Sequence, residues 1–181
     1  VIKLSRKIRK ITKKYKVKLI MNDSINLAKK INADGCHLGQ KDGLIKTAKK
    51  KLKGKIIGST CHNSKKFCLE AKKNKASYIA LGAFAKSKLK PKAIKANISI
   101  LRWAHKKINK PLVAIGGINN KNYKWILNAG ANYIALSSYI WNNPRLKPYE
   151  AIKKFNYEII SKWNKTWNDN WIQGWVLECF K

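Results

Sequence analysis

Short apolar runs alternate with basic stretches along most of the chain. The apolar runs predict buried strands at residues 17–21, 35–38, 55–59, 78–82, 111–115 and 133–136. The stretches between them have apolar residues at helical spacing and predict helices over 3–15, 25–31, 44–52, 64–73, 94–108, 120–128 and 148–165. Ser64 and Asn120 are the expected N-caps of two helices, and Gly130 ends the second. Strands joined by helical crossovers indicate a parallel α/β sheet.

Two of these strands end abruptly in small residues. Gly116 and Gly117 follow the run at 111–115, and Ser137 and Ser138 follow the run at 133–136. Small residues at a strand end leave backbone N–H groups open to an anion such as a phosphate. The last two strands of a (β/α)8 barrel commonly hold a phosphate in this way. The alternative is two buried strands followed by ordinary tight turns.

The strand–helix units recur at about twenty residues, which predicts an α/β fold of the TIM (β/α)8-barrel type. A closed barrel needs eight strands and only six are visible, so we expect an incomplete barrel that lacks a β-α-β segment before Val1. An incomplete gene product and a natural truncation both fit. We expect a barrel domain at 1–155 and a C-terminal helix with a Trp-rich tail at 156–181. In that tail, tryptophans recur every fourth residue, and we assign them no function: Trp163, Trp167, Trp171 and Trp175.

The net charge of +33 comes from 37 Lys and only 4 Arg. Lysines occur on every predicted helix, which indicates a solvated basic exterior with weak attraction to polyanions at low salt. Arginine is scarce, which argues against specific nucleic-acid recognition. No apolar run is long enough to span a bilayer, so we expect a cytoplasmic protein without a membrane partner. The four cysteines lack metal-binding spacing, and Cys36 and Cys61 fall in predicted strands as reduced, buried thiols.

Acidic residues are rare, which makes their positions informative. The chain has eight, and three of them lie between residues 23 and 42. Asp23 and Asp42 follow neighbouring strands, where two carboxylates can hold one Mg²⁺ that shares its other sites with water and phosphate oxygens. Other polar or small residues at the strand ends complete a site for two anionic ligands: Asn22, Gln40, Thr60, His62, Ser87, Lys90, Gly116, Gly117, Ser137 and Ser138.

These residues resemble the thiamine phosphate synthase family over about residues 1–155. Residues 19–23 (LIMND) and 33–42 (ADGCHLGQKD) are similar to its Asn-Asp and His-Leu-Gly-Gln-x-Asp motifs. Residues 57–62 resemble its Gly-x-Ser-x-His strand, with Thr60 in the serine position, and 78–90 resemble its Thr-x-Thr-Lys loop. The IGGI run at 115–118 and the final Ser-Ser pair complete the ordered series.

The resemblance implies a transferase of thiamine biosynthesis. It would join hydroxymethylpyrimidine pyrophosphate to a thiazole phosphate, by a Mg²⁺-dependent dissociative substitution without a protein nucleophile. Asp23 and Asp42 would be the magnesium ligands. The pyrimidine pyrophosphate would contact Asn22, Thr60 and Lys90. The thiazole phosphate would lie against Ser87, Leu89, Gly117, Ser137 and Ser138. The partners implied are small phosphorylated substrates, and a homo-oligomer stays open.

Several positions depart from the family pattern. Leu89 replaces a threonine, Ala83 and Lys86 replace prolines, and Ser137 replaces an aliphatic residue. The family's Gln-x-Arg-x-Lys motif, which grips the departing pyrophosphate, is absent from the chain. We therefore expect the isolated polypeptide to be weakly active or inactive.

Each prediction has a simpler alternative. Asp23 could cap the helix that begins near Ser24, and Asp42 could be a turn residue before Gly43. His37 and His62 are expected to be structural rather than catalytic bases. For the whole chain, the alternatives are a thiazole tautomerase, which has the same fold without the metal pair, a nonenzymatic polyanion-binding protein, and a decayed remnant.

Overall fold

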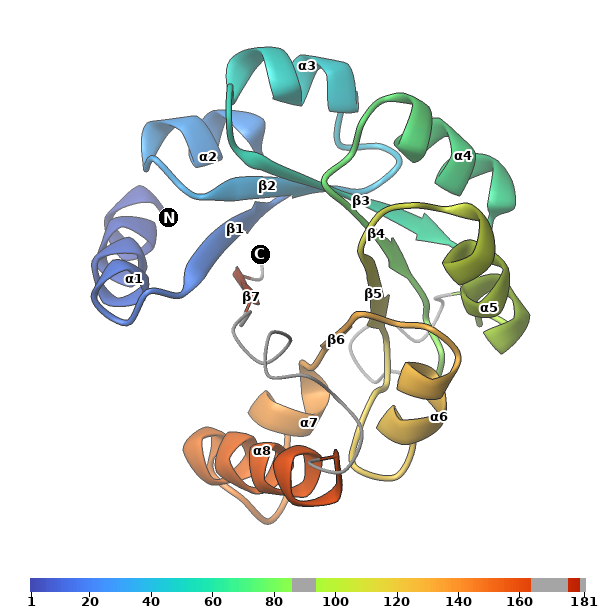
Figure 1. Ribbon diagram of the computed structural model, residues 1–181. Coiled ribbons are helices and arrows are strands. Elements are labelled where there is room, and N and C mark those ends of the chain that lie inside the picture. Colours follow the sequence, from blue (N-terminus) through green and yellow to red (C-terminus); the bar gives the residue numbers. More distant parts are fainter. Residues whose placement is uncertain (86–93, 164–175, 180–181) are drawn as a thin grey trace.

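The protein is a curled sheet of parallel strands with helices along its outer side (Figure 1). The computed structural model describes residues 1–85, 94–163 and 176–179. The order across the sheet is β6-β5-β4-β3-β2-β1-β7, so the sheet stays open between β6 and β7. The strands are β1 (Lys18–Asn22), β2 (Gly35–Leu38), β3 (Ile56–His62), β4 (Tyr78–Leu81), β5 (Leu112–Ile115), β6 (Tyr133–Ala135) and β7 (Val176–Cys179). The predicted fold class, an incomplete TIM-type barrel, is confirmed.

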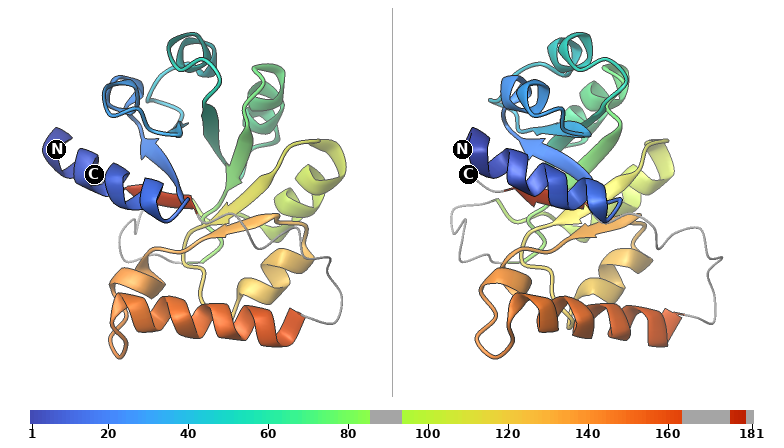
Figure 2. Two further views of the ribbon diagram at one scale, coloured as in Figure 1. Left: turned by 60° about the vertical axis from the view of Figure 1, so that its left-hand side comes forward. Right: turned by 90° about the vertical axis from the view of Figure 1, so that its left-hand side faces the viewer.

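Helices connect successive strands and lie outside the curl (Figure 2). They are α1 (Ile2–Lys14), α2 (Ile25–Lys30), α3 (Ile45–Lys51), α4 (Lys65–Lys73), α5 (Ile98–Lys107), α6 (Tyr123–Asn128), α7 (Ser138–Trp141) and α8 (Pro148–Trp163). Ser64 caps α4 as predicted, because its side chain accepts a hydrogen bond from Phe67 N. All six predicted strands are present, each within three residues of its predicted bounds.

The structure differs from the predicted elements at four places. β7 and α7 were not predicted. α5 begins at Ile98 rather than 94, because Ile94 and Ala96 exchange backbone hydrogen bonds with Ala83 before the helix starts. The predicted cap Asn120 is wrong, since α6 starts at Tyr123 after a turn in which Asn122 Oδ1 accepts from Asn119 N.

Alternate strand residues pack against the helices. Leu19 and Met21 of β1 join Ala28 of α2 in one buried cluster, while Ile79 and Leu81 of β4 belong to a second cluster. Successive side chains of a strand point to opposite faces, so the residues between them face the inside of the curl. These inner positions include four polar residues: Asn22 at the carboxyl end of β1, His37 within β2, Thr60 within β3 and Tyr78 at the start of β4.

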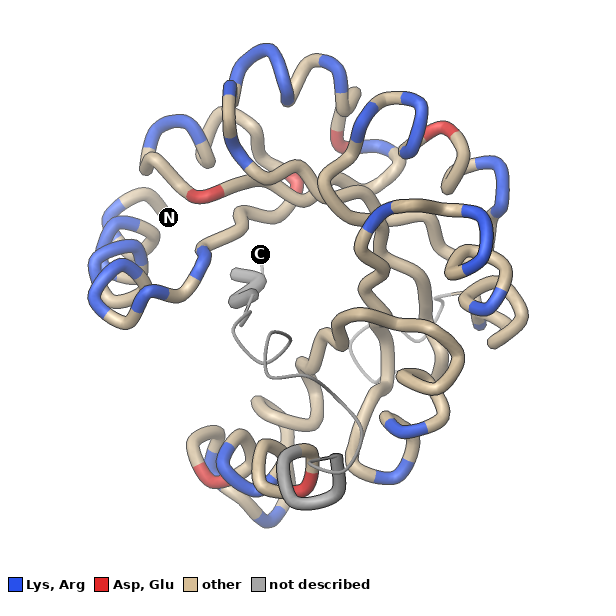
Figure 3. The backbone as a smooth tube through the Cα atoms, viewed as in Figure 1, with Lys and Arg blue, Asp and Glu red and all other residues tan. Residues whose placement is uncertain are grey.

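The described lysines and arginines lie mainly on the outer helices and loops (Figure 3), in agreement with the predicted basic exterior. Cys36 and Cys61 are buried free thiols, as predicted. Within the described residues, no helix combines the length and apolar character needed to cross a bilayer. The boundary predicted after residue 155 lies inside α8, and the division into two domains stays a prediction.

Candidate active site

The predicted site residues of the described chain lie at one rim of the sheet. Because every strand pair is parallel, the carboxyl ends of the strands meet at the same edge. This edge brings together Asn22, Asp23, Asp42, Thr60, Gly117, Ser137 and Ser138. Three further predicted contacts, Ser87, Leu89 and Lys90, lie outside the described residues.

Asp23 and Asp42 act on a common neighbour. Asp23 leaves β1 in a left-handed conformation (φ 62°), and its backbone N–H donates to His37 O of the adjacent strand at 2.8 Å. Burial raises the pKa of the Cys36 thiol to about 12, and the negative charges of Asp23 and Asp42 both contribute to the rise. The backbone bond holds Asp23 beside β2, and Asp42 follows that same strand, so both acids lie near the carboxyl end of β2.

The alternatives for the two acids have different outcomes. Ser24, not Asp23, caps α2, because the Ser24 hydroxyl accepts from Leu27 N at 3.2 Å. The capping alternative for Asp23 is therefore wrong. Asp42 does stabilise a turn, since its Oδ2 accepts from Gly39 N at 2.9 Å. Gly39 permits this approach, because a Cβ there would lie 2.5 Å from Asp42 Oδ2.

The donor set around these acids suits a hard divalent cation that is shared with a ligand. Among the described residues, no three His, Cys, Asp or Glu side chains form a metal cluster, so a site built on protein ligands alone is absent there. Two carboxylates with several water or phosphate oxygens is instead the arrangement that Mg²⁺ prefers. Next to Asp23, the buried Asn22 Oδ1 has no hydrogen-bond partner in the described part of the chain. These residues fit Mg²⁺.

A chain of hydrogen bonds crosses three strands beneath the carboxylates. His37 Nδ1 lies 2.8 Å from the Tyr78 hydroxyl, and His37 Nε2 lies 2.7 Å from Thr60 Oγ1. His37 is only 6% exposed and stacks on the Tyr78 ring. Both ring nitrogens are used in bonds to hydroxyls, which supports the expected structural role for His37. His62, by contrast, is exposed.

Sequence reasoning missed Tyr78 as a member of this series of hydrogen bonds. It also missed Gly58 as the residue that leaves room for the Tyr78 ring. A Cβ on Gly58 would lie 2.1 Å from Tyr78 Cζ and 2.5 Å from His37 Nδ1. A glycine inside a strand marks a close approach. That signal was present at residue 58, but it does not say which side chain approaches.

The other half of the rim is built from backbone. Gly116 and Gly117 have φ values of 93° and 66°, and a Cβ on Gly117 would lie 2.7 Å from Ala85 Cβ. The Gly117 and Ser138 N–H groups donate to no backbone or side-chain acceptor among the described residues. Ser137 Oγ is buried and also lacks a partner there. Both strand ends therefore offer the polar groups that the predicted phosphate site needs.

The third acid of this region does different work. Asp34 precedes β2, at the opposite end of the strands, and its Oδ2 accepts from Arg9 Nη1 at 2.6 Å and from Leu19 N at 2.9 Å. These contacts fix α1 and β1 to the start of β2. Asp34 is therefore structural and does not belong to the rim.

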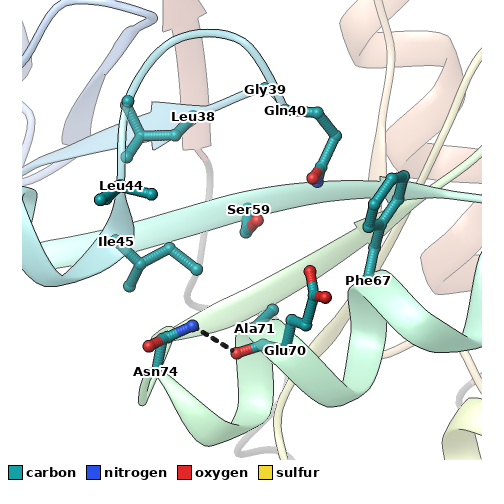
Figure 4. Close-up of a pocket in the computed structure, with 11 residues that line it drawn as sticks. Leu38, Gly39, Gln40, Leu44, Ile45, Ser59, Phe67, Glu70, Ala71 and Asn74 are labelled. Carbon is teal, nitrogen blue, oxygen red and sulfur yellow. Dashed lines mark hydrogen bonds between the residues drawn. The ribbon is translucent and has the colours of Figure 1, made fainter.

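A cavity of about 100 Å³ lies beside the rim, between α3 and α4 (Figure 4). Gln40 and Gly43 form one wall, and Phe67 and Glu70 of α4 form the other. The Gln40 side-chain amide also donates to Thr60 O. The cavity therefore adjoins the loop that carries Asp42 but lies on the helix side of the sheet, away from the inner polar residues.

The amino-acid sequence is similar to those of known thiamine-phosphate synthases. Residues 1–140 match the family model described as thiamine monophosphate synthase. A thiamine-phosphate synthase of Pelagibacter ubique is 50% identical over 151 residues, which cover 83% of this chain and 73% of that protein. The thiamine-phosphate synthase of Nitrosospira multiformis is 41% identical over 135 residues, which cover 74% of this chain and 58% of that protein.

A solved structure gives the same result for the fold. Thiamine phosphate pyrophosphorylase from Pyrococcus furiosus superposes with a TM-score of 0.79 at 27% identity, over 88% of this chain and 76% of that one. The chain thus spans about three fifths to three quarters of the length of these relatives. Sequence match, superposition and rim geometry agree with the predicted resemblance, and the chain belongs to the thiamine monophosphate synthase family.

Proposed function

We propose that the protein is a transferase that condenses hydroxymethylpyrimidine pyrophosphate with a thiazole phosphate to give thiamine phosphate and pyrophosphate. The observation that carries the proposal is the position of Asp23 and Asp42 after the neighbouring parallel strands β1 and β2, on the same rim as Gly117 and Ser138. A rim with an acidic half and a neutral half suits two anionic ligands, only one of which needs a metal.

In this proposal, Asp23 and Asp42 would hold Mg²⁺ against the pyrophosphate. Bound there, the ion would neutralise the charge that grows on the departing pyrophosphate. Asn22 and the Thr60 hydroxyl hydrogen-bond to the same anion, and Lys90 contributes a cation. The bond between the pyrimidine methylene and the pyrophosphate oxygen breaks, and its electron pair leaves with the pyrophosphate. The ring nitrogen of the thiazole phosphate then bonds to that methylene through its lone pair.

The neutral half holds the second substrate. The N–H groups of Gly117 and Ser138 and the hydroxyl of Ser137 would donate to the thiazole phosphate, with Ser87 and Leu89 alongside. The protein keeps the two anions apart and aligned, which is the main requirement of a substitution that needs no protein nucleophile. Residues 1–155 would form this catalytic domain.

Binding of the pyrimidine pyrophosphate to this chain tests the proposal. We expect calorimetry at 0.3 M KCl to show binding that requires Mg²⁺, and Asp23→Asn to weaken it about 100-fold. Glu150→Gln is the matched control, because it removes one exposed carboxylate and keeps an oxygen for the bond from Lys147 N. Binding that ignores Mg²⁺ and Asp23 but collapses with salt would instead favour the polyanion-binding alternative.

A further inference from the structure

The cavity between α3 and α4 carries polar groups that the proposed reaction does not use. It has a volume of about 100 Å³. A single water needs about 10–15 Å³ of such space, so the cavity has room for a ligand of several non-hydrogen atoms. Its lining is mixed, with the Phe67 ring and aliphatic side chains beside a carboxylate, a hydroxyl and two amides (Figure 4).

The hydroxyl of this lining belongs to Ser59 of β3. Ser59 is only 5% exposed, and its side chain makes no hydrogen bond to any residue that the structure describes. A buried hydroxyl without a partner lowers stability, and such groups are rare in folded proteins. A bound ligand with an N–H group would supply the hydrogen bond that the Ser59 oxygen lacks.

The carboxylate of Glu70 gives the cavity its charge. Figure 4 shows this carboxylate extending from α4 toward the end of the Gln40 side chain. The chain has 41 Lys and Arg, yet the Glu70 carboxylate forms no ion pair or hydrogen bond within the described ranges. Because the Gln40 amide nitrogen donates to Thr60 O, the oxygen of that amide stays an acceptor. A carboxylate with two neutral oxygen acceptors suits a cation that has N–H donors and disfavours an anion.

We propose that this cavity binds a small primary alkylammonium ion. An –NH₃⁺ group has three donors, and the cavity offers it the carboxylate of Glu70, the hydroxyl of Ser59 and the side-chain oxygen of Gln40. A short alkyl chain packs against the Phe67 ring and the aliphatic part of the lining. An inorganic cation would leave that apolar part unused.

The cavity and the rim are separate places for a cation. Gln40 lines the cavity, and Asp42, two residues later, belongs to the rim. The cavity lies on the helix side of the sheet, so an ammonium ion there needs neither Mg²⁺ nor the rim acids. The pair of Asp23 and Asp42 is nevertheless the other acidic place to which a cation could bind, and the experiment has to separate the two.

An NMR titration of the full chain with n-butylammonium in 0.15 M KCl tests the proposal. We expect the side-chain amide signals of Gln40 to shift with a Kd of about 1 mM, as befits so small a ligand. Glu70→Gln should raise the Kd about tenfold, and Ser59→Ala about threefold. Glu70 is exposed and the Ser59 hydroxyl has no bond to lose, so both variants should fold. Unchanged affinity in Glu70→Gln would overturn the proposal.

Two further comparisons fix the place and the chemistry of binding. We expect Glu150→Gln, which removes an exposed carboxylate of α8, and Asp23→Asn, which alters the rim, to keep the affinity for n-butylammonium. Tetramethylammonium has the charge without N–H donors, and n-butanol has a donor without the charge, so each should bind at least about tenfold more weakly. Loss of binding in Asp23→Asn, or equal affinity for either of these compounds, would show that the ligand does not bind as proposed. The proposed function predicts the opposite pattern for the pyrimidine pyrophosphate, whose binding depends on Asp23 and not on Glu70, so each proposal can fail while the other stands.

Discussion

In the proposed function, each half of the rim holds an anion, but the two halves use different parts of the chain. At β1 to β3, the polar groups are side chains: two carboxylates, the Asn22 amide and the Thr60 hydroxyl. At β5 and β6, they are mainly backbone N–H groups, which lie beside glycines in left-handed conformations after β5 and beside serines after β6. Side chains can carry charge and hold a metal, whereas backbone groups only need space around them.

This difference predicts which kind of substitution impairs function in each half of the rim. The side-chain half should lose function when a charge is removed and keep its fold. The backbone half should lose function when a Cβ is added, because the chain there has no room for one. Substitutions in one half should leave binding at the other half unchanged, since the proposed function assigns the two anions to separate strand ends.

The largest effect is expected from Asp42→Asn. The amide keeps an oxygen to accept from Gly39 N, so the turn survives, but the negative charge is lost. We expect affinity for the pyrimidine pyrophosphate with Mg²⁺ to fall about 100-fold and affinity for the thiazole phosphate to stay the same. Calorimetric titration with each ligand checks this, with Glu150→Gln as control. Equal losses for both ligands would contradict the division of the rim.

Asp34→Ala should show that not every acid near β2 serves the site. It leaves the buried Leu19 N–H without its side-chain acceptor and breaks the bond to Arg9, so we expect the free energy of unfolding to fall by about 2 kcal/mol. Asp34→Asn keeps an oxygen for Leu19 N and should lose less. Urea unfolding of both variants measures the difference. A loss of Mg²⁺-dependent binding in folded Asp34→Asn would argue against the structural role.

The acids also show how far sequence reasoning reaches. The position of Asp23 and Asp42 at the rim was predictable, because each residue follows an apolar strand and parallel strands end at one rim. The spacing cannot show that Asp42 also bonds to Gly39 N, or that Asp34 points to Arg9, because these contacts depend on the turn and on how α1 packs.

The elements were predictable to a similar degree. Apolar runs located the strands well because strands buried on both faces leave a clear signal. β7 was missed because its partner β1 is more than 150 residues away, and pairing at that distance leaves no local pattern. Tyr78 was predicted only as part of a buried strand, since its hydrogen bond to His37 spans 41 residues.

Gly117→Ala tests the backbone half. A Cβ there would lie 2.7 Å from Ala85 Cβ and 2.8 Å from the Ala85 carbonyl oxygen, and the turn would have to move. We expect affinity for the thiazole phosphate to fall about tenfold, which corresponds to about 1.4 kcal/mol. Gly54→Ala is the matched control: its φ of 73° is also left-handed, but nothing lies within 4 Å of the added carbon. Equal behaviour of the two variants would show that backbone strain alone, and not the crowded rim, is responsible.

The smallest expected effect concerns the buried Cys36 thiol near the acidic half of the rim. Burial and the two carboxylates raise the pKa of Cys36 to about 12, so the folded protein keeps the thiol proton at pH values where the unfolded chain loses it. The unfolded state then binds fewer protons, and stability falls as pH rises above about 8.5. Between pH 8 and pH 9.5 this thiol should lower the free energy of unfolding by about 1 kcal/mol. Cys36→Ala, compared with the parent by urea unfolding at both pH values, should lack that part of the decline. Burial is the largest cause of the raised pKa, so parallel pH dependences of the two proteins would mean that the fold does not raise the pKa of the Cys36 thiol.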